Sequence, residues 1–453
     1  MFLKKNTSLA KTNTNTVEND HDQANFQHGH MSAERQIKKQ LLDSIFNSLD
    51  LSLLETLPEE QAREQISETA ALLLLEKDVP LNAESRKRVI EEIGDEILGL
   101  GPLEPLLKDK SISDILVNAH NQIYVERKGK LEITDASFRD DSHLLNVIDR
   151  IVSQVGRRID EGSPMVDARL KDGSRVNAII PPLAIDGPSL SIRRFAVERL
   201  QMDQLLDYGT LNAEMAHFLE AIVQGRLNIL ISGGTGSGKT TTLNVCSGYI
   251  PKNERIITIE DSAELQLQQP HVVRLETRPP NIEGRGAITQ RELVINSLRM
   301  RPDRIVVGEV RGAEAVDMLA AMNTGHDGSM TTIHANTPRD ALGRIENMFA
   351  MAGWNMPIKN VRAQIASALN VVVQLRRMED GKRRITSIVE INNMEGDVIT
   401  MTELFRFQRT GIDEEGNVTG QYCSTGNVPS FMEAFKHLGI DLPYSYFTAP
   451  GGL

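Results

Sequence analysis

The feature that most constrains this chain is a glycine-rich segment, ILISGGTGSGKTTTLN, at residues 229–244. It contains the pattern G-x-x-x-x-G-K-T, with Gly233, Gly238, Lys239 and Thr240 at the defined positions. The preceding LNILIS is apolar and β-branched, which indicates a buried strand, and the following TTLNVCSGYI is compatible with a helix. A phosphate-binding loop requires a strand, a loop and a helix in this order. The chain is therefore expected to bind a nucleotide.

The residue types of this segment suit phosphate binding for specific reasons. Glycines let successive backbone N–H groups point at phosphate oxygens, and the start of the helix adds a partial positive charge. Lys239 is expected to reach the β- and γ-phosphates, and Thr240 to offer its hydroxyl to Mg²⁺. An ordinary glycine-rich turn is the alternative, but a chance match has odds of roughly one or two in a hundred. The expected nucleotide-binding residues are Gly233, Gly234, Thr235, Gly236, Ser237, Gly238, Lys239, Thr240 and Thr241.

Composition narrows the class of protein. A length of 453 residues allows two or three domains, and the net charge of −12 argues against broad affinity for nucleic acid or acidic membranes. The two cysteines, Cys246 and Cys423, lack metal-site spacing and fit a reducing compartment. No apolar run reaches the ~18–20 residues that span a bilayer, and the N-terminus lacks a signal-peptide pattern. We expect a cytosolic protein with peripheral membrane association through partners.

Changes in composition and in hydrophobic periodicity divide the chain into five parts. Residues 1–33 are polar and expected to be a disordered tail. Residues 34–105 show helical periodicity and predict a small helical bundle, either a docking module or a packing appendage. Residues 106–195 predict an α+β domain on an antiparallel sheet, with strands paired around a turn at Lys128–Gly129. After a linker at 196–207, residues 208–453 alternate strands and helices, which indicates an α/β domain with a largely parallel sheet.

Three further strand-like runs end in reactive residue types. The run RIITIE ends at Glu260 and is followed within four residues by Glu264. The run RIVVGE ends at Glu309, and GSMTTI is followed by His334. Ligands bind at the carboxyl ends of strands in open parallel sheets. These three ends and the glycine-rich loop are therefore expected to form one site.

Phosphoryl transfer to water assigns roles to these side chains. Glu309 is expected to hold Mg²⁺ through water, although aspartate is more usual at such a position. Glu264 is placed to orient water as a general base. His334 is expected to contact the γ-phosphate, and His326, in NTGHDG, either does the same or is a structural histidine.

Arginines from outside the loop commonly touch the γ-phosphate in such enzymes. Arg175, in DGSRVNAI, and Arg193 or Arg194, in SIRRF, lie near the end of the middle domain, just before the expected linker. They are candidates to close over the nucleotide. Plain surface charge is the alternative, and the residues alone favour it.

Longer motifs resemble a known family. ITIEDSAEL, LRMRPDRIVVGEVRGAEAVDML and NTGHDGSMTTIHANTPRDALGRIENM resemble the secretion-ATPase superfamily of type II secretion, type IV pili and type IV secretion. Within it, MVDARLKDGSRVNAIIPPLA, RLETRPPNIEG and FQRTGIDEEGNVTGQYCSTGNVPSF most resemble the CpaF branch, the ATPases of tight-adherence (Tad or Flp) pili. The resemblance covers roughly residues 80–440.

This resemblance implies a RecA-like C-terminal P-loop domain in a homohexameric ring. It also implies that ATP turnover with Mg²⁺ drives inner-membrane pilus platform proteins from the cytoplasmic face. Ser262 departs from the proline that retraction and type II ATPases often carry, and two cysteines cannot build the zinc module of type II ATPases. The residues that match family motifs are the Walker A pair Lys239 and Thr240, the catalytic Glu264, the Walker B acid Glu309, the His-box pair His326 and His334, and the phosphate-reaching Arg175 and Arg193.

The expected function is thus that of a hexameric cytosolic ATPase motor for Tad pilus assembly, with retraction left open. A type IV secretion traffic ATPase moving protein or DNA is the alternative within the same class. A nucleic-acid translocase on a RecA core, a GTPase switch and a non-enzymatic ATP-binding scaffold are further alternatives. The acidic charge weighs against the translocase, so no direct nucleic-acid contact is expected, and the lack of an N-K-x-D segment weighs against the GTPase. The direction of the motor, the partner of 34–105, the order in which sites fire, and the roles of the tail and of 400–453 stay open.

Overall fold

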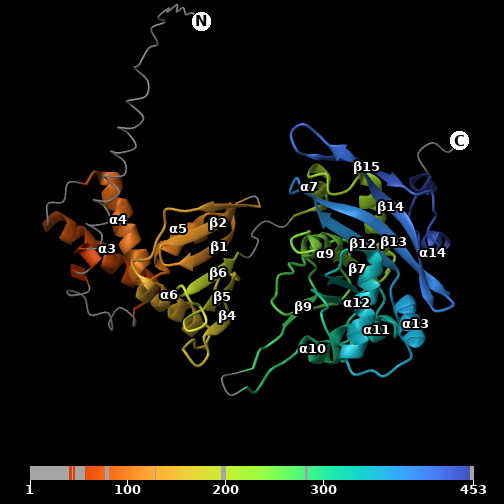
Figure 1. Ribbon diagram of the computed structural model, residues 1–453, viewed down its shortest axis with the longest axis horizontal. Coiled ribbons are helices and arrows are strands. Elements are labelled where there is room, and N and C mark those ends of the chain that lie inside the picture. The colour runs from red at the N-terminus through yellow and green to blue at the C-terminus, as the bar shows by residue number, and fades with distance from the viewer. Residues whose placement is uncertain are drawn as a thin grey trace, which may run out of the picture. The chain divides into compact units, whose positions relative to one another are not determined.

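The computed structural model describes residues 40–42, 44–45, 57–76, 81–127, 129–194, 200–280 and 284–448. The expected tail at 1–33 and the first part of the expected linker, 196–199, lie outside the described residues. The chain divides into two compact units, unit 1 (Met1–Ala196) and unit 2 (Val197–Leu453), and each is described by itself (Figure 1).

Unit 1 begins with a helical part. Helix α3 (Glu59–Glu76) places Ala62, Ile66, Ala70 and Leu74 at four-residue intervals, so that they form one buried stripe. This stripe packs in one cluster with Val89 and Ile93 of α4 (Ala83–Ile97). A short 3₁₀ turn (Gly101–Leu103) and helix α5 (Glu104–Lys108) follow, so helical structure ends close to the expected boundary at 105.

The rest of unit 1 is a six-stranded antiparallel sheet with the order β3-β2-β1-β6-β5-β4. Alternate residues such as Ile115, Val117 and Ile192 form its core with apolar residues of helix α6 (Asp141–Gln154). Three strands form at 112–133, where two were expected, because a turn at 120–121 separates β1 from β2. The strands are β1 (Ile112–Ala119), β2 (Gln122–Arg127), β3 (Lys130–Ile133), β4 (Met165–Arg169), β5 (Arg175–Ile179) and β6 (Ser189–Arg193).

Unit 2 is built on a nine-stranded sheet with the order β15-β14-β13-β12-β7-β11-β10-β8-β9. From β12 to β9 each neighbouring pair is parallel, as expected. From β12 to β15 the pairs are antiparallel, which the polar, glycine-punctuated sequence past residue 400 did not suggest. The strands are β7 (Ile229–Gly233), β8 (Ile256–Glu260), β9 (Val272–Glu276), β10 (Arg304–Val307), β11 (Met330–Ile333), β12 (Val371–Arg377), β13 (Arg383–Glu395), β14 (Val398–Ile412) and β15 (Val418–Ser424).

Helices cover both faces of the parallel half of this sheet (Figure 1). One apolar cluster contains Phe218 and Leu243 of the helices beside β7, and a second contains Leu342 and Ile365 of other helices. All five residues of β7 are buried as a result, which explains the apolar run at residues 229–231. The helices are α7 (Met202–Asp207), α8 (Ala213–Gln224), α9 (Lys239–Ser247), α10 (Gln290–Ser297), α11 (Glu314–Met322), α12 (Pro338–Met351), α13 (Ile358–Ala368) and α14 (Met432–His437), and a 3₁₀ turn covers Tyr444–Phe447.

The linker was expected to cover residues 196–207, but a helix occupies the last six residues of this range. Residues Met202–Asp207 form α7, and a capping box between Gln201 and Gln204 starts this helix. Met202 and Leu205 are three positions apart on one helix face and are buried in the core of unit 2. A short apolar pattern of this kind is easily mistaken for a connecting segment.

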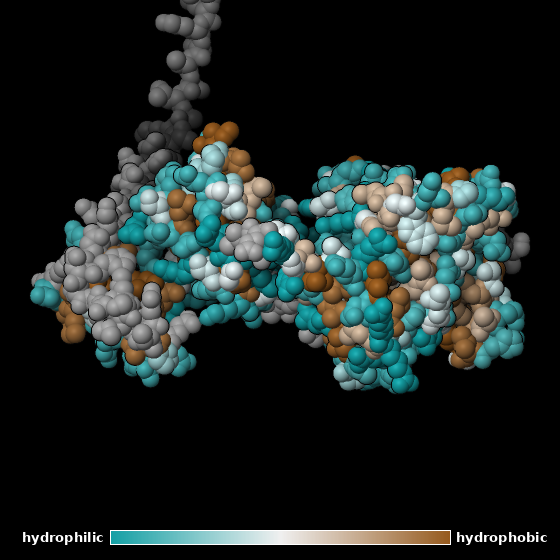
Figure 2. Space-filling view, turned by 90° about the horizontal axis from the view of Figure 1, so that it is seen from below, coloured by the Kyte–Doolittle hydropathy of each residue, from teal (hydrophilic) through white to brown (hydrophobic). Residues whose placement is uncertain are grey.

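The surface is mostly hydrophilic in the view of Figure 2, with smaller hydrophobic areas between polar side chains. Large apolar residues that are well exposed include Leu72 and Ile185 in unit 1 and Met351 in unit 2. Scattered apolar side chains of this kind are ordinary on protein surfaces. Among the helices of the described residues, none has the length and apolar character needed to cross a bilayer.

A buried ion pair fastens the amino-terminal edge of the parallel sheet. Arg304, at the start of β10, is fully buried, and its Nε lies 2.5 Å from Glu254 Oε2. Its second terminal nitrogen donates to Glu254 Oε1 at 3.2 Å, and the first donates to the Val223 carbonyl at 2.7 Å. The arginine thus joins the end of α8 to the segment before β8.

Replacing Arg304 by alanine is expected to lower the free energy of unfolding by about 3–5 kcal/mol, because Glu254 would keep its buried charge without a partner. Urea denaturation of the purified variant measures this change. Arg299→Ala removes the same charge from an exposed position and is expected to cost no more than about 0.5 kcal/mol. Equal losses of unfolding free energy in the two variants would mean that the ion pair does not contribute to stability beyond an ordinary surface charge.

Candidate active site

Four parallel strands bring their carboxyl ends to one edge of the unit 2 sheet. Strand β7 pairs with β11, which pairs with β10, which pairs with β8. Ile333 at the end of β11 lies opposite Ser232 of β7, and Val307 at the end of β10 lies opposite Ile259 of β8. The glycine-rich loop, Glu309, the segment after Glu260 and His334 therefore emerge side by side.

At two positions of the glycine-rich loop the backbone has a conformation that only glycine adopts easily. Gly236 and Gly238 have φ of 67° and 96°, and Gly238 caps the start of α9. Gly233 is required by space, because an added Cβ would lie 2.4 Å from Ser237 Oγ and 2.8 Å from the Leu375 carbonyl oxygen. The loop can thus turn tightly into the first turn of α9, where Thr240 and Thr241 follow Lys239.

Lys239 lies between the loop and the end of β10. Its Nζ donates to the Gly234 carbonyl at 3.2 Å and lies 3.8 Å from Glu309 Oε1. Burial lowers the pKa of Lys239, and the Glu309 carboxylate opposes that shift. The ammonium is therefore partly stripped of water, which strengthens its interaction with any anion that reaches the loop.

Arg311 joins the acids at this edge, and sequence reasoning gave it no role. Its Nε donates to Glu309 Oε2 at 2.9 Å, and a terminal nitrogen lies 3.7 Å from Asp261 Oδ2. Burial alone would lower the pKa of Arg311, but the hydrogen bond and charge of Glu309 raise it, and the charges of Asp261 and Glu264 add to this. The pattern GEVRG could have predicted this contact, because an arginine two residues after an acid at the end of a strand can reach back to that acid.

Glu264 lies on a segment whose backbone N–H groups donate to the side chains of three other residues. Glu260 Oε1 accepts from the backbone N–H of Glu264 at 2.8 Å and from that of Leu265 at 2.9 Å. Glu276 Oε2 accepts from Ala263 N–H at 3.1 Å, and Asn244 Oδ1 of α9 accepts from Gln266 N–H at 2.9 Å. The backbone that presents Glu264 is thus tied to the helix that follows the phosphate loop.

Glu260 is a further acid at this edge, which the sequence marks only as the end of the strand-like run RIITIE. It is buried at the end of β8, and its Oε2 has no hydrogen-bond partner within the described parts of the chain. Burial raises the pKa of Glu260 to about 7, although its bonds to the Glu264 and Leu265 N–H groups lower it. A buried carboxyl with this pKa is protonated in mildly acidic solution, which the sequence pattern does not reveal.

The pKa of Glu260 predicts a pH-dependent stability. Because the folded chain holds this proton more tightly than an unfolded chain with the ordinary value of 4.5, the free energy of unfolding falls as pH rises from 4.5 to about 7. The full cost above that pH is about 3 kcal/mol. Glu260→Gln removes the titration and keeps a carbonyl oxygen that accepts from Glu264 N–H. Denaturation measured at about pH 5 and about pH 8 should show that the free energy of unfolding of the variant, relative to that of the wild type, rises by about that amount between the two pH values. The same pH dependence of stability in both proteins would contradict this prediction.

The two histidines of the predicted pair lie at opposite edges of the sheet. His334 directly follows β11, beside the start of the phosphate loop. His326 precedes β11, and its Nδ1 lies 3.3 Å from the Ala321 carbonyl at the end of α11. The structure does not bring His326 to the loop of its own chain, because β11 runs between the two histidines.

Arg175 and Arg193 belong to unit 1, where they are direct cross-strand partners in β5 and β6. Their side chains therefore share the exposed face of the sheet. Arg193 Nε donates to Asp114 Oδ1 at 3.1 Å, and Arg169 of β4 lies opposite Arg175, which extends the row. The contact of Arg175 and Arg193 with a nucleotide stays a prediction.

Gln290 joins two strand ends at this edge. With its amide oriented to suit both neighbours, its nitrogen donates to the Glu309 carbonyl at 3.2 Å and its oxygen accepts from Asp261 N–H at 3.3 Å. It is the first residue of α10, far from either partner in sequence. Such a contact leaves no local sequence signal.

The arrangement can cradle a polyphosphate and place a carboxylate near its end. The loop offers N–H groups and the Lys239 ammonium, and Thr240 and Glu309 offer the oxygen ligands that Mg²⁺ takes. Glu264 is the carboxylate on a fixed segment, and Arg311 balances the negative charge around it. This set suits nucleotide hydrolysis.

The chain is similar to known proteins over most of its length. The family model described as "Type II/IV secretion system protein" matches residues 96–414. The chain is 39% identical over 313 residues to a Mycobacterium tuberculosis protein named for conjugal transfer, with 68% of this chain and 88% of that protein aligned. It is 30% identical over 348 residues to the type IV secretion system protein VirB11 of Bartonella quintana, covering 68% of this chain and 96% of that one. The crystal structure of the VirB11 ATPase of Brucella suis, in complex with sulphate, aligns at 29% identity over 63% of this chain and 94% of that chain, with a TM-score of 0.35.

Proposed function

Because the chain belongs to the family of type II/IV secretion system ATPases, we propose that it uses ATP hydrolysis to drive a membrane-bound secretion or pilus machine. One observation carries this proposal. The phosphate loop, Glu309, Glu264 and His334 emerge from neighbouring parallel strands at one edge of the unit 2 sheet. A scaffold that only binds nucleotide would not need the acid set beside the loop.

The chain's own residues divide the work of hydrolysis. The loop from Gly233 to Thr241 binds the phosphates, and Lys239 balances the charge of the β- and γ-phosphates. Thr240 and Glu309 would hold Mg²⁺, which would supply further charge neutralisation. Glu264 accepts the proton of the attacking water, and His334 contacts the γ-phosphate.

We propose further that the chain acts as a homohexamer at the cytoplasmic face of the inner membrane. In this assembly it contacts membrane platform proteins. Arg175 and Arg193 reach the phosphates from unit 1. His326, placed away from the loop of its own chain, keeps a structural role at the end of α11.

The finer function has two candidates. The motifs around 165–184 and 407–431 favour assembly of a Tad pilus, with retraction a further option. The relatives named for conjugal transfer and for type IV secretion favour a traffic ATPase that moves protein or DNA. Both need the same hydrolytic site, so the distinction lies in the partner and not in the chemistry.

The first test is steady-state ATPase activity of the purified chain with its mass measured by light scattering. Hydrolysis by a species of about six chains, indifferent to added DNA, supports the motor. Activity that appears only with DNA and in a monomer would overturn it in favour of a translocase. In cells that lack the chain, loss of surface pili identifies the Tad function, and loss of conjugal transfer or protein export with intact pili identifies the traffic ATPase.

A further inference from the structure

Strand β12 brings two arginines alongside the phosphate loop. It runs parallel to β7, with Leu375 opposite Gly233, the last residue of β7. From there β7 turns into the loop while β12 continues to Arg377, and β13 returns with Arg383 directly opposite Arg377. Direct partners in an antiparallel pair share one face, so the two side chains lie together.

Both arginines reach the loop itself. Arg383 Nε donates to the Gly236 carbonyl at 2.9 Å. An added Cβ at Gly238 would lie 3.3 Å from Arg383 Cδ, and one at Gly236 would lie 3.7 Å from a terminal nitrogen of Arg377. The outer side of the loop is therefore lined by two cations from a segment more than 130 residues away in sequence.

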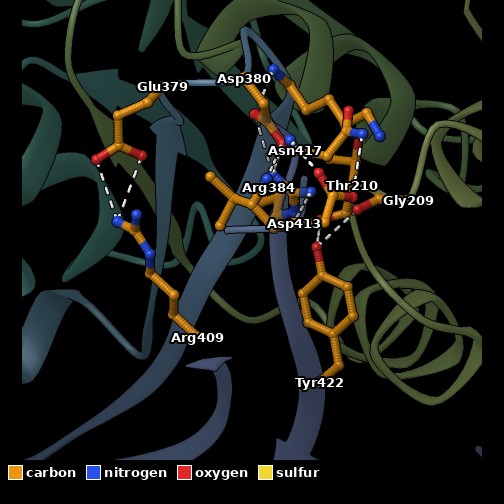
Figure 3. A network of polar contacts seen from close by, with 11 residues as sticks. Gly209, Thr210, Glu379, Asp380, Arg384, Arg409, Asp413, Asn417 and Tyr422 are labelled. Carbon is orange, nitrogen blue, oxygen red and sulfur yellow. Dashed lines mark hydrogen bonds and ion pairs between the residues drawn. The ribbon is translucent and has the colours of Figure 1, made fainter. Parts of the chain in front are cut away.

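The hairpin that carries these arginines is firmly held (Figure 3). Asp380, in its turn, accepts from Arg384 at 3.0 Å and from Val418 N–H of β15 at 3.0 Å. Arg384 also donates to the Val418 carbonyl at 3.0 Å and lies over the Phe407 ring at 5.2 Å. Burial would raise the pKa of Asp380, but its hydrogen bonds and Arg384 lower it.

Other contacts fix the same hairpin to its surroundings. Glu379 pairs with Arg409 of β14 at 3.1 Å. Thr210, which precedes α8, accepts from the Ile385 N–H at 2.8 Å and from the Tyr422 hydroxyl at 2.7 Å. The position of Arg377 and Arg383 is thus set by β14, β15 and the start of unit 2.

We propose that Arg377 and Arg383 are positioning residues for the nucleotide polyphosphate, and this rests on the proposed function. Arg383 holds the Gly236 carbonyl on the outer side of the loop, so that loop N–H groups stay directed inward at phosphate oxygens. The two guanidinium charges also attract the triphosphate, and the effect is larger for Arg383 because it is hydrogen-bonded to the loop. Neither residue takes part in bond breaking.

The test measures binding of a fluorescent ATP analogue and, separately, kcat at saturating ATP. Arg383→Ala is expected to raise Kd about tenfold and Arg377→Ala about threefold, with kcat changed less than about threefold. Arg383→Lys restores the charge and should recover part of the affinity. Loss of a cation near the phosphates should also flatten the dependence of Kd on salt, which a purely structural defect would not do.

Arg376→Ala is the matched control. Arg376 is exposed and pairs with Arg384, so it lies on the opposite face of β12, and its loss changes the net charge equally. It should leave Kd and its salt dependence unchanged. Wild-type affinity in both Arg377→Ala and Arg383→Ala would overturn the inference, as would an equal effect of Arg376→Ala. Failure of the wild-type chain to bind the analogue would instead refute the proposed function.

Discussion

Replacing Lys239 by alanine is expected to lower kcat for ATP hydrolysis by at least about a hundredfold and to weaken ATP binding. The ammonium lies 3.8 Å from Glu309 Oε1 and 3.2 Å from the Gly234 carbonyl, at the centre of the strand ends. Removing one preorganised group that stabilises charge in a transition state costs about 10²–10³ in rate. Because Lys239 is partly desolvated, water replaces it poorly.

Steady-state hydrolysis and titration with a fluorescent ATP analogue measure the two effects of this variant. Lys252→Ala removes the same charge from an exposed loop and serves as the control, with activity expected at the wild-type level. Near-normal turnover in Lys239→Ala would show that the phosphates bind elsewhere. The assignment of the whole loop would then fail.

Glu264→Gln is expected to separate binding from hydrolysis. The variant keeps the size of the side chain, and its backbone N–H still donates to Glu260, so the segment after β8 stays in place. The amide cannot accept a proton from water, and loss of a general base lowers rates by about 10²–10⁴. We therefore expect kcat to fall by that factor while Kd for ATP changes less than about threefold.

Single-turnover hydrolysis and analogue binding, measured on one preparation, check this separation. Glu395→Gln, at an exposed position in β13, is the matched control and should hydrolyse ATP normally. Loss of binding together with hydrolysis would make Glu264 a structural residue or a Mg²⁺ ligand. Full activity would exclude it as the base.

Local patterns made much of the site predictable. The phosphate loop is continuous in sequence, and the runs rich in β-branched residues before Glu260, Glu309 and His334 favour strands. The parallel sheet then requires their ends to meet. His326 shows the limit of motif matching. The strand GSMTTI stands between it and His334, so both cannot lie at the same edge of one chain's sheet.

Contacts that depend on strand order could not be predicted from local sequence. Arg383 meets Gly236 only because β12 is inserted next to β7. The Arg304–Glu254 pair joins segments 50 residues apart. Gly-punctuated sequence beyond residue 400 gave no hint that β14 and β15 extend the sheet, because half-exposed antiparallel strands carry many polar residues.

The anchoring of the β12–β13 hairpin has a thermodynamic consequence. Asp380 and Arg384 bind both backbone groups of Val418, and Arg383, next in the chain, holds the phosphate loop. Because coupling between two sites is reciprocal, if loosening β15 weakened nucleotide affinity through this hairpin, bound nucleotide would make β15 harder to open by the same free energy.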